Sequence, residues 1–124
     1  MGYLAVFIGG GIGAALRHGV NRAALAWLGP AFPYGTMIVN IAGGLLMGML
    51  AELFLIKGGG SQEWRLFLTT GGLGGFTTFS AFSLDAALMW ERGDHAMLAA
   101  YVLGSVLLSI AALFAGMAAV RGLA

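Results

Sequence analysis

The chain has 124 residues, of which 60% are hydrophobic and 9% are charged, and this composition excludes an ordinary water-soluble domain. A net charge of +1 provides no basic surface for nucleic acid. The sequence contains no cysteine, which excludes disulfides and thiol chemistry. Four apolar stretches of the ~20 residues that a membrane-spanning helix needs occupy nearly all of the chain. We therefore expect an all-α membrane protein, with a single transmembrane domain over residues 1–124.

The four expected spans follow one another with short loops between them. The first begins at Tyr3 and either ends near Leu16 or continues through Arg17 to Trp27; the longer range, 3–27, places an aromatic residue at each membrane interface. The other spans cover residues 34–56, 64–90 and 96–120, with an exposed glycine-rich loop at 57–61. Four crossings place both termini and this loop on the same side of the membrane.

The positive charges show no bias toward either side on this topology. The side of the termini carries Lys57, Arg65 and Arg121, and the opposite side carries Arg17, Arg22 and Arg92. Because excess positive charge sets the orientation of a membrane protein, a balanced chain can insert both ways. We therefore predict an antiparallel, dual-topology homodimer.

The third span contains the most informative stretch of the sequence, with glycine at four of five consecutive positions: 71, 72, 74 and 75. Each glycine costs a helix about 1 kcal/mol relative to alanine, so we expect the third helix to break here at membrane depth. Freed backbone carbonyls are tolerated there only when they are buried in protein or line a wet cavity, and they are good ligands for a small cation. The alternative is that the glycines only allow close helix packing, which we favour for Gly9, Gly13, Gly44 and Gly48.

Polar side chains recur within the second and fourth spans. Asn40 lies about six residues into the second span and needs a hydrogen-bond partner or a watery cavity; the alternative is an ordinary hydrogen bond between helices. Tyr101, Ser105 and Ser109 recur every four residues, which places three hydroxyls on one stripe of the fourth helix. We favour a cavity lining over serines that bond the carbonyl one turn earlier.

Two phenylalanines follow the expected break at an interval of three residues. Phe79 and Phe82 therefore project from one face of the resumed helix. Such rings usually pack, but their positive edges can also stabilise a small anion, and Thr78 adds a hydroxyl nearby.

The ionisable residues do not form an active site. We expect the carboxylates to lie toward the ends of the spans; they are Glu52, Glu63, Asp85, Glu91 and Asp94. His18 and His95 are expected in solvated loops at one mouth, and neither has the spacing of a metal site. Since no nucleophile stands with a base, the chain is not expected to be an enzyme.

Three motifs together resemble the CrcB or Fluc fluoride channels: GGLGGFTTFSAFS at 71–83, GTMIVNIAG at 35–43 and GIGAALR at 11–17. The resemblance covers the whole chain and implies passive export of cytoplasmic fluoride across the bacterial inner membrane by an antiparallel homodimer with two pores. It implies a structural sodium ion at the dimer centre, held by backbone carbonyls at positions matching Gly74 and Thr77. It implies a fluoride path lined by Asn40, Thr78, Phe79, Phe82, Tyr101, Ser105 and Ser109.

Arg17 resembles the family arginine at the end of the first helix, and His18 stands where the family often has an aromatic residue.

Two other functions fit the size of the chain. A proton-coupled exporter would need a membrane carboxylate in the first span, which the sequence lacks, and a non-transporting scaffold would not need the hydroxyl stripe.

Overall fold

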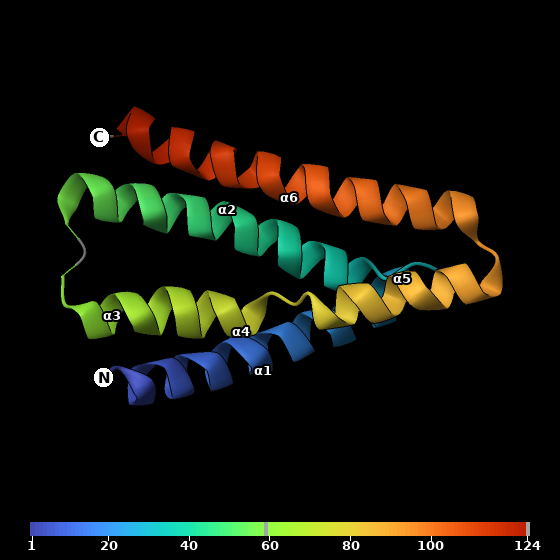
Figure 1. The fold of residues 1–124 in the computed structure, drawn as a ribbon, viewed down its shortest axis with the longest axis horizontal. Helices are drawn as coiled ribbons and strands as arrows, with labels where there is room; N and C mark the ends of the chain where they lie inside the picture. The colour runs from blue at the N-terminus through green and yellow to red at the C-terminus, as the bar shows by residue number, and fades with distance from the viewer. Residues whose placement is uncertain (59, 124) are drawn as a thin grey trace.

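The computed structural model describes residues 1–58 and 60–123 and shows four helical crossings (Figure 1). Gly59, in the expected loop, and Ala124, in the expected domain, lie outside the described residues. Three crossings are single helices: α1 (Tyr3–Leu28), α2 (Tyr34–Lys57) and α6 (His95–Leu123). The third crossing is divided into α3 (Gln62–Leu66), the π-helix η1 (Phe67–Leu73), α4 (Gly74–Phe76) and α5 (Ser80–Arg92). Each end of a crossing lies within three residues of the expected one.

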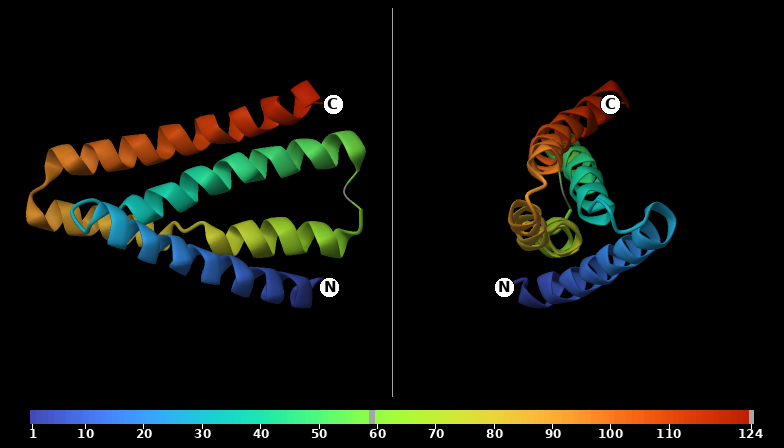
Figure 2. Two further views of the ribbon diagram at one scale, coloured as in Figure 1. Left: turned by 180° about the vertical axis from the view of Figure 1, so that it is seen from behind. Right: turned by 90° about the vertical axis from the view of Figure 1, so that its right-hand side faces the viewer.

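The four crossings run alternately up and down. Both chain ends and the connection between α2 and α3 lie at one end of the molecule, and the other two connections lie at the opposite end (Figures 1 and 2). Across the view of Figure 1, α6 lies beside α2, and the third crossing lies beside α1. Among the described residues, α1, α2 and α6 are each long and apolar enough to cross a membrane. This arrangement confirms the expected order of four helices.

The first helix is continuous past Arg17, which corrects three expectations. The shorter range ending at Leu16 is wrong, because α1 continues to Leu28. Arg17 therefore lies inside the helix, not at its end, and His18 is an exposed helical residue, not a loop residue. With Arg17 inside the helix, the side of the termini keeps three positive residues, and the opposite side has two in place of the expected three.

The glycines of the third crossing pack against α1. A Cβ atom added to Gly13 would collide with the carbonyl oxygen of Gly72, and one added to Gly75 would collide with that of Gly10. The two backbones therefore touch, which only glycine permits. The chain does not unwind at the glycines themselves: Gly71 and Gly72 lie in the π-helix η1, and Gly74 and Gly75 lie in α4.

The interruption of the third crossing lies just after the glycines, at residues 77–79 between α4 and α5. The backbone at Thr77 is extended, with φ −84° and ψ 162°. The physical reason for this displacement is hydrogen bonding. Unwound backbone at membrane depth needs hydrogen-bond partners from elsewhere in the protein. Such partners reach residue 78, whereas the packed glycines remain helical and need none.

Small residues also bring α2 and α6 together. A Cβ atom on Gly48 would collide with the carbonyl oxygen of Leu113, and one on Gly44 would lie 2.6 Å from that of Ser109, as the packing interpretation of these two glycines predicts. At the end of the molecule that holds the termini, Arg121 of α6 donates to Glu52 of α2 with an Nε–Oε1 distance of 2.7 Å.

We expect Gly13→Ala to lower the stability of the protein in lipid or detergent. The added methyl group would overlap the Gly72 carbonyl and lie 2.8 Å from the backbone nitrogen of Phe76, and such overpacking costs about 1–3 kcal/mol. Gly11→Ala is the matched control, because no heavy atom of the described residues lies within 4 Å of its Cβ position. The measurement is the midpoint of thermal unfolding. Equal midpoints for the two variants would contradict the packing described above.

Candidate functional site

Asn40 of α2 holds the interrupted segment through both atoms of its amide. Its Nδ2 donates to the carbonyl oxygen of Thr78 at 2.9 Å, and its Oδ1 accepts from the backbone nitrogen of Thr78 at 2.8 Å. These bonds satisfy the peptide groups that the break frees from the helix. The amide nitrogen carries two hydrogens, so one N–H remains for a further acceptor. Asn40 therefore does form a hydrogen bond between helices, the alternative left open by the sequence, and it keeps one donor.

The start of α5 is fixed by side-chain hydroxyls of the same segment. The Thr78 hydroxyl accepts from the backbone nitrogen of Ala81, the second residue of α5, at 3.1 Å, and so satisfies one of the free N–H groups at the start of the helix. The Ser83 hydroxyl donates to the carbonyl oxygen of Phe79 at 2.9 Å. Phe79 directly precedes α5 and Phe82 is its third residue, and their ring centroids lie 5.6 Å apart, so these bonds help to fix the segment that carries both rings.

A cavity of about 320 Å³ opens between the break, α5 and α6. Six of the seven residues expected to line the ion path surround it: Asn40, Thr78, Phe79, Phe82, Ser105 and Ser109. The hydroxyl oxygens of Ser105 and Ser109 are buried and have no hydrogen-bond partner in the described part of the chain. The alternative that these serines bond the carbonyl one turn earlier is therefore wrong. A buried hydroxyl without a partner is costly, so both are available to a bound group.

Tyr101, the seventh expected residue, lies next to this cavity but does not line it. The side chain is fully buried, and its hydroxyl donates to Asp85 at 2.9 Å. Its ring lies 5.2 Å from that of Phe82 and 5.5 Å from that of Phe32, measured between centroids. Tyr101 therefore separates the first cavity from a second one, which Phe32 lines.

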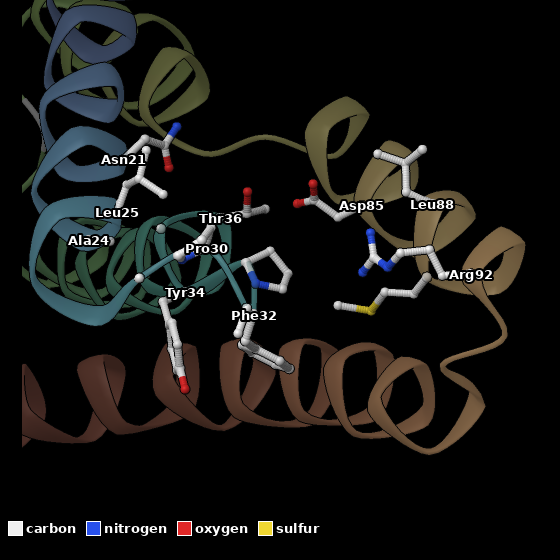
Figure 3. A pocket seen from close by; sticks show the side chains of 15 residues that line it. Asn21, Ala24, Leu25, Pro30, Phe32, Tyr34, Thr36, Asp85, Leu88 and Arg92 are labelled. Carbon is white, nitrogen blue, oxygen red and sulfur yellow. The ribbon is translucent and has the colours of Figure 1, made fainter.

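The second cavity, of about 300 Å³, lies at the end of the molecule away from the termini and is more polar (Figure 3). The side chains of Asp85 and Arg92 extend from α5 toward Thr36 and the loop after α1 (Figure 3). Asp85, expected toward the end of the third span, is half-buried within α5. Glu52 is likewise buried, 7% exposed, against its partner arginine. The interval of three residues between Phe82 and Asp85 could have indicated that both side chains lie on the same face of the helix.

The backbone around the break offers oxygen ligands for a cation. The Leu73 carbonyl accepts from the backbone nitrogen and the hydroxyl of Thr77, both at 3.0 Å. The Gly75 carbonyl accepts from Arg17 Nε at 3.0 Å. Within residues 1–58 and 60–123, no hydrogen bond is accepted by the carbonyls of Gly74 or Thr77. The two positions expected to hold sodium therefore keep their oxygens free at the C-terminal, negative end of a helical segment.

Comparison with known proteins gives a consistent result. Residues 4–117 match the family described as CrcB-like protein, Camphor Resistance (CrcB). A fluoride-specific ion channel FluC of Methylobacterium nodulans is 62% identical over 118 residues, 95% of this chain and 94% of that protein. Proteins with this name from Rhodopseudomonas palustris and, as FluC 2, from Nitrobacter hamburgensis are 58% and 51% identical over 123 residues, 99% of each chain. These relatives are named as ion channels, which supports the expectation that the chain is not an enzyme. By the family match and these identities, the chain belongs to the CrcB family.

Proposed function

We propose that the chain forms a fluoride-selective channel through which cytoplasmic fluoride leaves the cell passively, across the bacterial inner membrane. The observation that carries this proposal is the pair of buried, unpartnered hydroxyls of Ser105 and Ser109, which face a cavity between two phenyl rings and the free N–H of Asn40. The names of the relatives, fluoride-specific ion channels, support the identity of the ion.

The cavity can replace the hydration shell of a small anion step by step. Hydroxyl and amide hydrogens supply short hydrogen bonds, and the positive edges of the Phe79 and Phe82 rings supply weak attraction. None of the described residues that line the cavity carries a charge. Conduction requires sites that bind weakly and in series, and a fixed cation in the path would hold fluoride too tightly. Hydroxyl and amide donors also favour fluoride over chloride, because the smaller ion has the higher charge density and accepts shorter, stronger hydrogen bonds.

The proposed working form is an antiparallel homodimer of chains inserted in opposite orientations. Phe79 is 77% exposed in the single chain although it lines the cavity, and an inverted copy would cover it. The charge distribution leaves two positive residues, Arg22 and Arg92, opposite three, a weak bias for orientation. Tags at both termini should be found on both sides of the membrane in cells. Termini found only on the cytoplasmic side would refute the dual topology.

A structural sodium ion fits the backbone at the break. Carbonyl oxygens are ligands that suit a small hard cation, and those of Gly74 and Thr77 accept no hydrogen bond in the described part of the chain. In the proposed dimer, the two breaks meet and share one ion. The ion, when bound, would supply fixed positive charge that holds the two negative helix ends together.

The Ser105→Ala, Ser109→Ala double variant tests the role of the hydroxyls. Because the two oxygens are buried without partners, their removal should raise the thermal unfolding midpoint or leave it unchanged, since a buried unsatisfied hydroxyl costs about 1–3 kcal/mol. Fluoride efflux from liposomes should fall about tenfold or more, since fluoride loses two donors. Ser61→Ala, at the cap of α3, is the control and should keep its efflux. Full efflux by the double variant would refute the proposed path.

A further inference from the structure

Arg17 is a charged side chain inside an apolar helix, fourteen residues after α1 begins. A guanidinium at membrane depth is costly and needs a specific partner. Its partner is the backbone carbonyl of Gly75, which accepts from Nε at 3.0 Å. This carbonyl belongs to α4, the last helical residues before the interruption.

The glycine packing brings Arg17 to this carbonyl. Gly13, one turn before Arg17, lies so close to the third crossing that an added Cβ would be 2.8 Å from the backbone nitrogen of Phe76. Side chains four residues apart lie on one face of a helix, so Arg17 extends from the same face toward the end of α4. The contact thus follows from the sequence interval between the glycine and the arginine.

Hydrogen bonds sort the carbonyls at the end of α4 into two groups. Leu73 is bonded by Thr77, Gly75 by Arg17 and Thr78 by Asn40. The carbonyls of Gly74, Phe76 and Thr77 accept no hydrogen bond in the described part of the chain, and the first and last of these are the expected sodium ligands. Of the three bonded carbonyls, Gly75 is the one whose partner comes from α1. Gly75 lies between Gly74 and Thr77 in the sequence, so the direction of its carbonyl constrains the directions of their carbonyls.

We infer that Arg17 is a positioning residue for the proposed cation site: by holding the Gly75 carbonyl, its Nε orients α4 so that the Gly74 and Thr77 carbonyls face the ion. This inference rests on the proposed function with its structural sodium. The carbonyls are oriented by the hydrogen bond and not by the positive charge, because a positive charge near sodium would by itself weaken sodium binding.

Three variants separate the hydrogen bond from the charge. Arg17→Gln removes the charge but carries an amide nitrogen as many bonds from the backbone as arginine Nε. Arg17→Met removes both the charge and the donor. Arg22→Met removes an exposed positive charge from the same helix and is the matched control. The readout is the sodium concentration that gives half of the maximal thermal stabilisation of the purified dimer, with fluoride efflux measured in parallel.

We expect Arg17→Met to require about tenfold more sodium, as the loss of one hydrogen bond predicts, and Arg17→Gln to stay within about threefold of the parent protein. Arg22→Met should match the parent. An unchanged or tighter sodium response in Arg17→Met would overturn the inference, and so would a tenfold weaker response in Arg17→Gln, even where the methionine variant fails to fold.

The parent protein distinguishes this inference from the function on which it rests. A parent that passes fluoride but shows no sodium response refutes the role of Arg17 and the sodium site, and leaves the channel intact. A parent that passes no fluoride refutes the channel itself. A sodium response that weakens in Arg17→Met while the parent conducts supports both.

Discussion

Asn40→Asp should reduce fluoride efflux from liposomes about 100-fold, a change that corresponds to about 2.7 kcal/mol. The carboxylate keeps an acceptor for the Thr78 backbone nitrogen but places an oxygen against the Thr78 carbonyl, where Nδ2 now donates at 2.9 Å. The break loses one of the two bonds that fix it. The cavity also loses its free N–H and gains a negative charge that repels an anion. Initial efflux rates, read with a fluoride electrode, measure the effect.

Thr69→Val is a suitable control for Asn40→Asp. It removes a hydrogen bond from a side chain to the backbone, Thr69 Oγ1 to the Arg65 carbonyl at 2.7 Å, on the same crossing but away from the break. Its efflux should match that of the parent. If Asn40→Asp conducts as well as this control, the amide neither fixes the break nor serves the ion, and the site described above is wrong.

Phe82→Ile should abolish most fluoride efflux while the protein still folds. Isoleucine keeps an apolar side chain at the position but has no ring edge to face an anion. The substitution also removes the ring that lies between Phe79 and Tyr101, at centroid distances of 5.6 and 5.2 Å. We expect efflux to fall about 100-fold, with a much smaller change in unfolding midpoint because the volume lost is modest.

Phe114→Ile is the matched control for Phe82→Ile. Phe114 lies on α6 with 64% of its surface exposed in the single chain, and it does not line the cavity. The same chemical change there should leave efflux within about twofold of the parent. Equal loss in both variants would mean that phenylalanine acts through general packing, the alternative that the sequence left open.

The sequence predicts the four crossings from the length of its apolar stretches and part of the cavity lining from the intervals between residues. Apolar stretches of the right length define the crossings, and intervals of three or four residues place Phe79 with Phe82 and Ser105 with Ser109. Tyr101 follows the same interval and was expected to line the cavity, but it is buried beside it and its hydroxyl donates to Asp85. An interval along one helix does not reveal a partner on another.

The position of the break could not be obtained from the sequence. Glycine density indicates weak helix propensity, but these glycines stay helical because close contact with α1 compensates. The chain unwinds where Asn40, 38 residues away, satisfies the Thr78 peptide groups. The resemblance placed Arg17 at the end of the first helix, whereas the distant carbonyl of Gly75 accepts its hydrogen bond within the helix.

Ion selectivity of the purified protein tests the central claim most directly. Liposomes containing the parent protein are loaded with potassium fluoride or potassium chloride, and anion efflux is started with a potassium ionophore. Our account predicts rapid loss of fluoride and chloride loss no faster than in liposomes without protein, because the described residues that line the cavity offer a few neutral donors and no fixed charge. Chloride efflux as fast as fluoride efflux would contradict it.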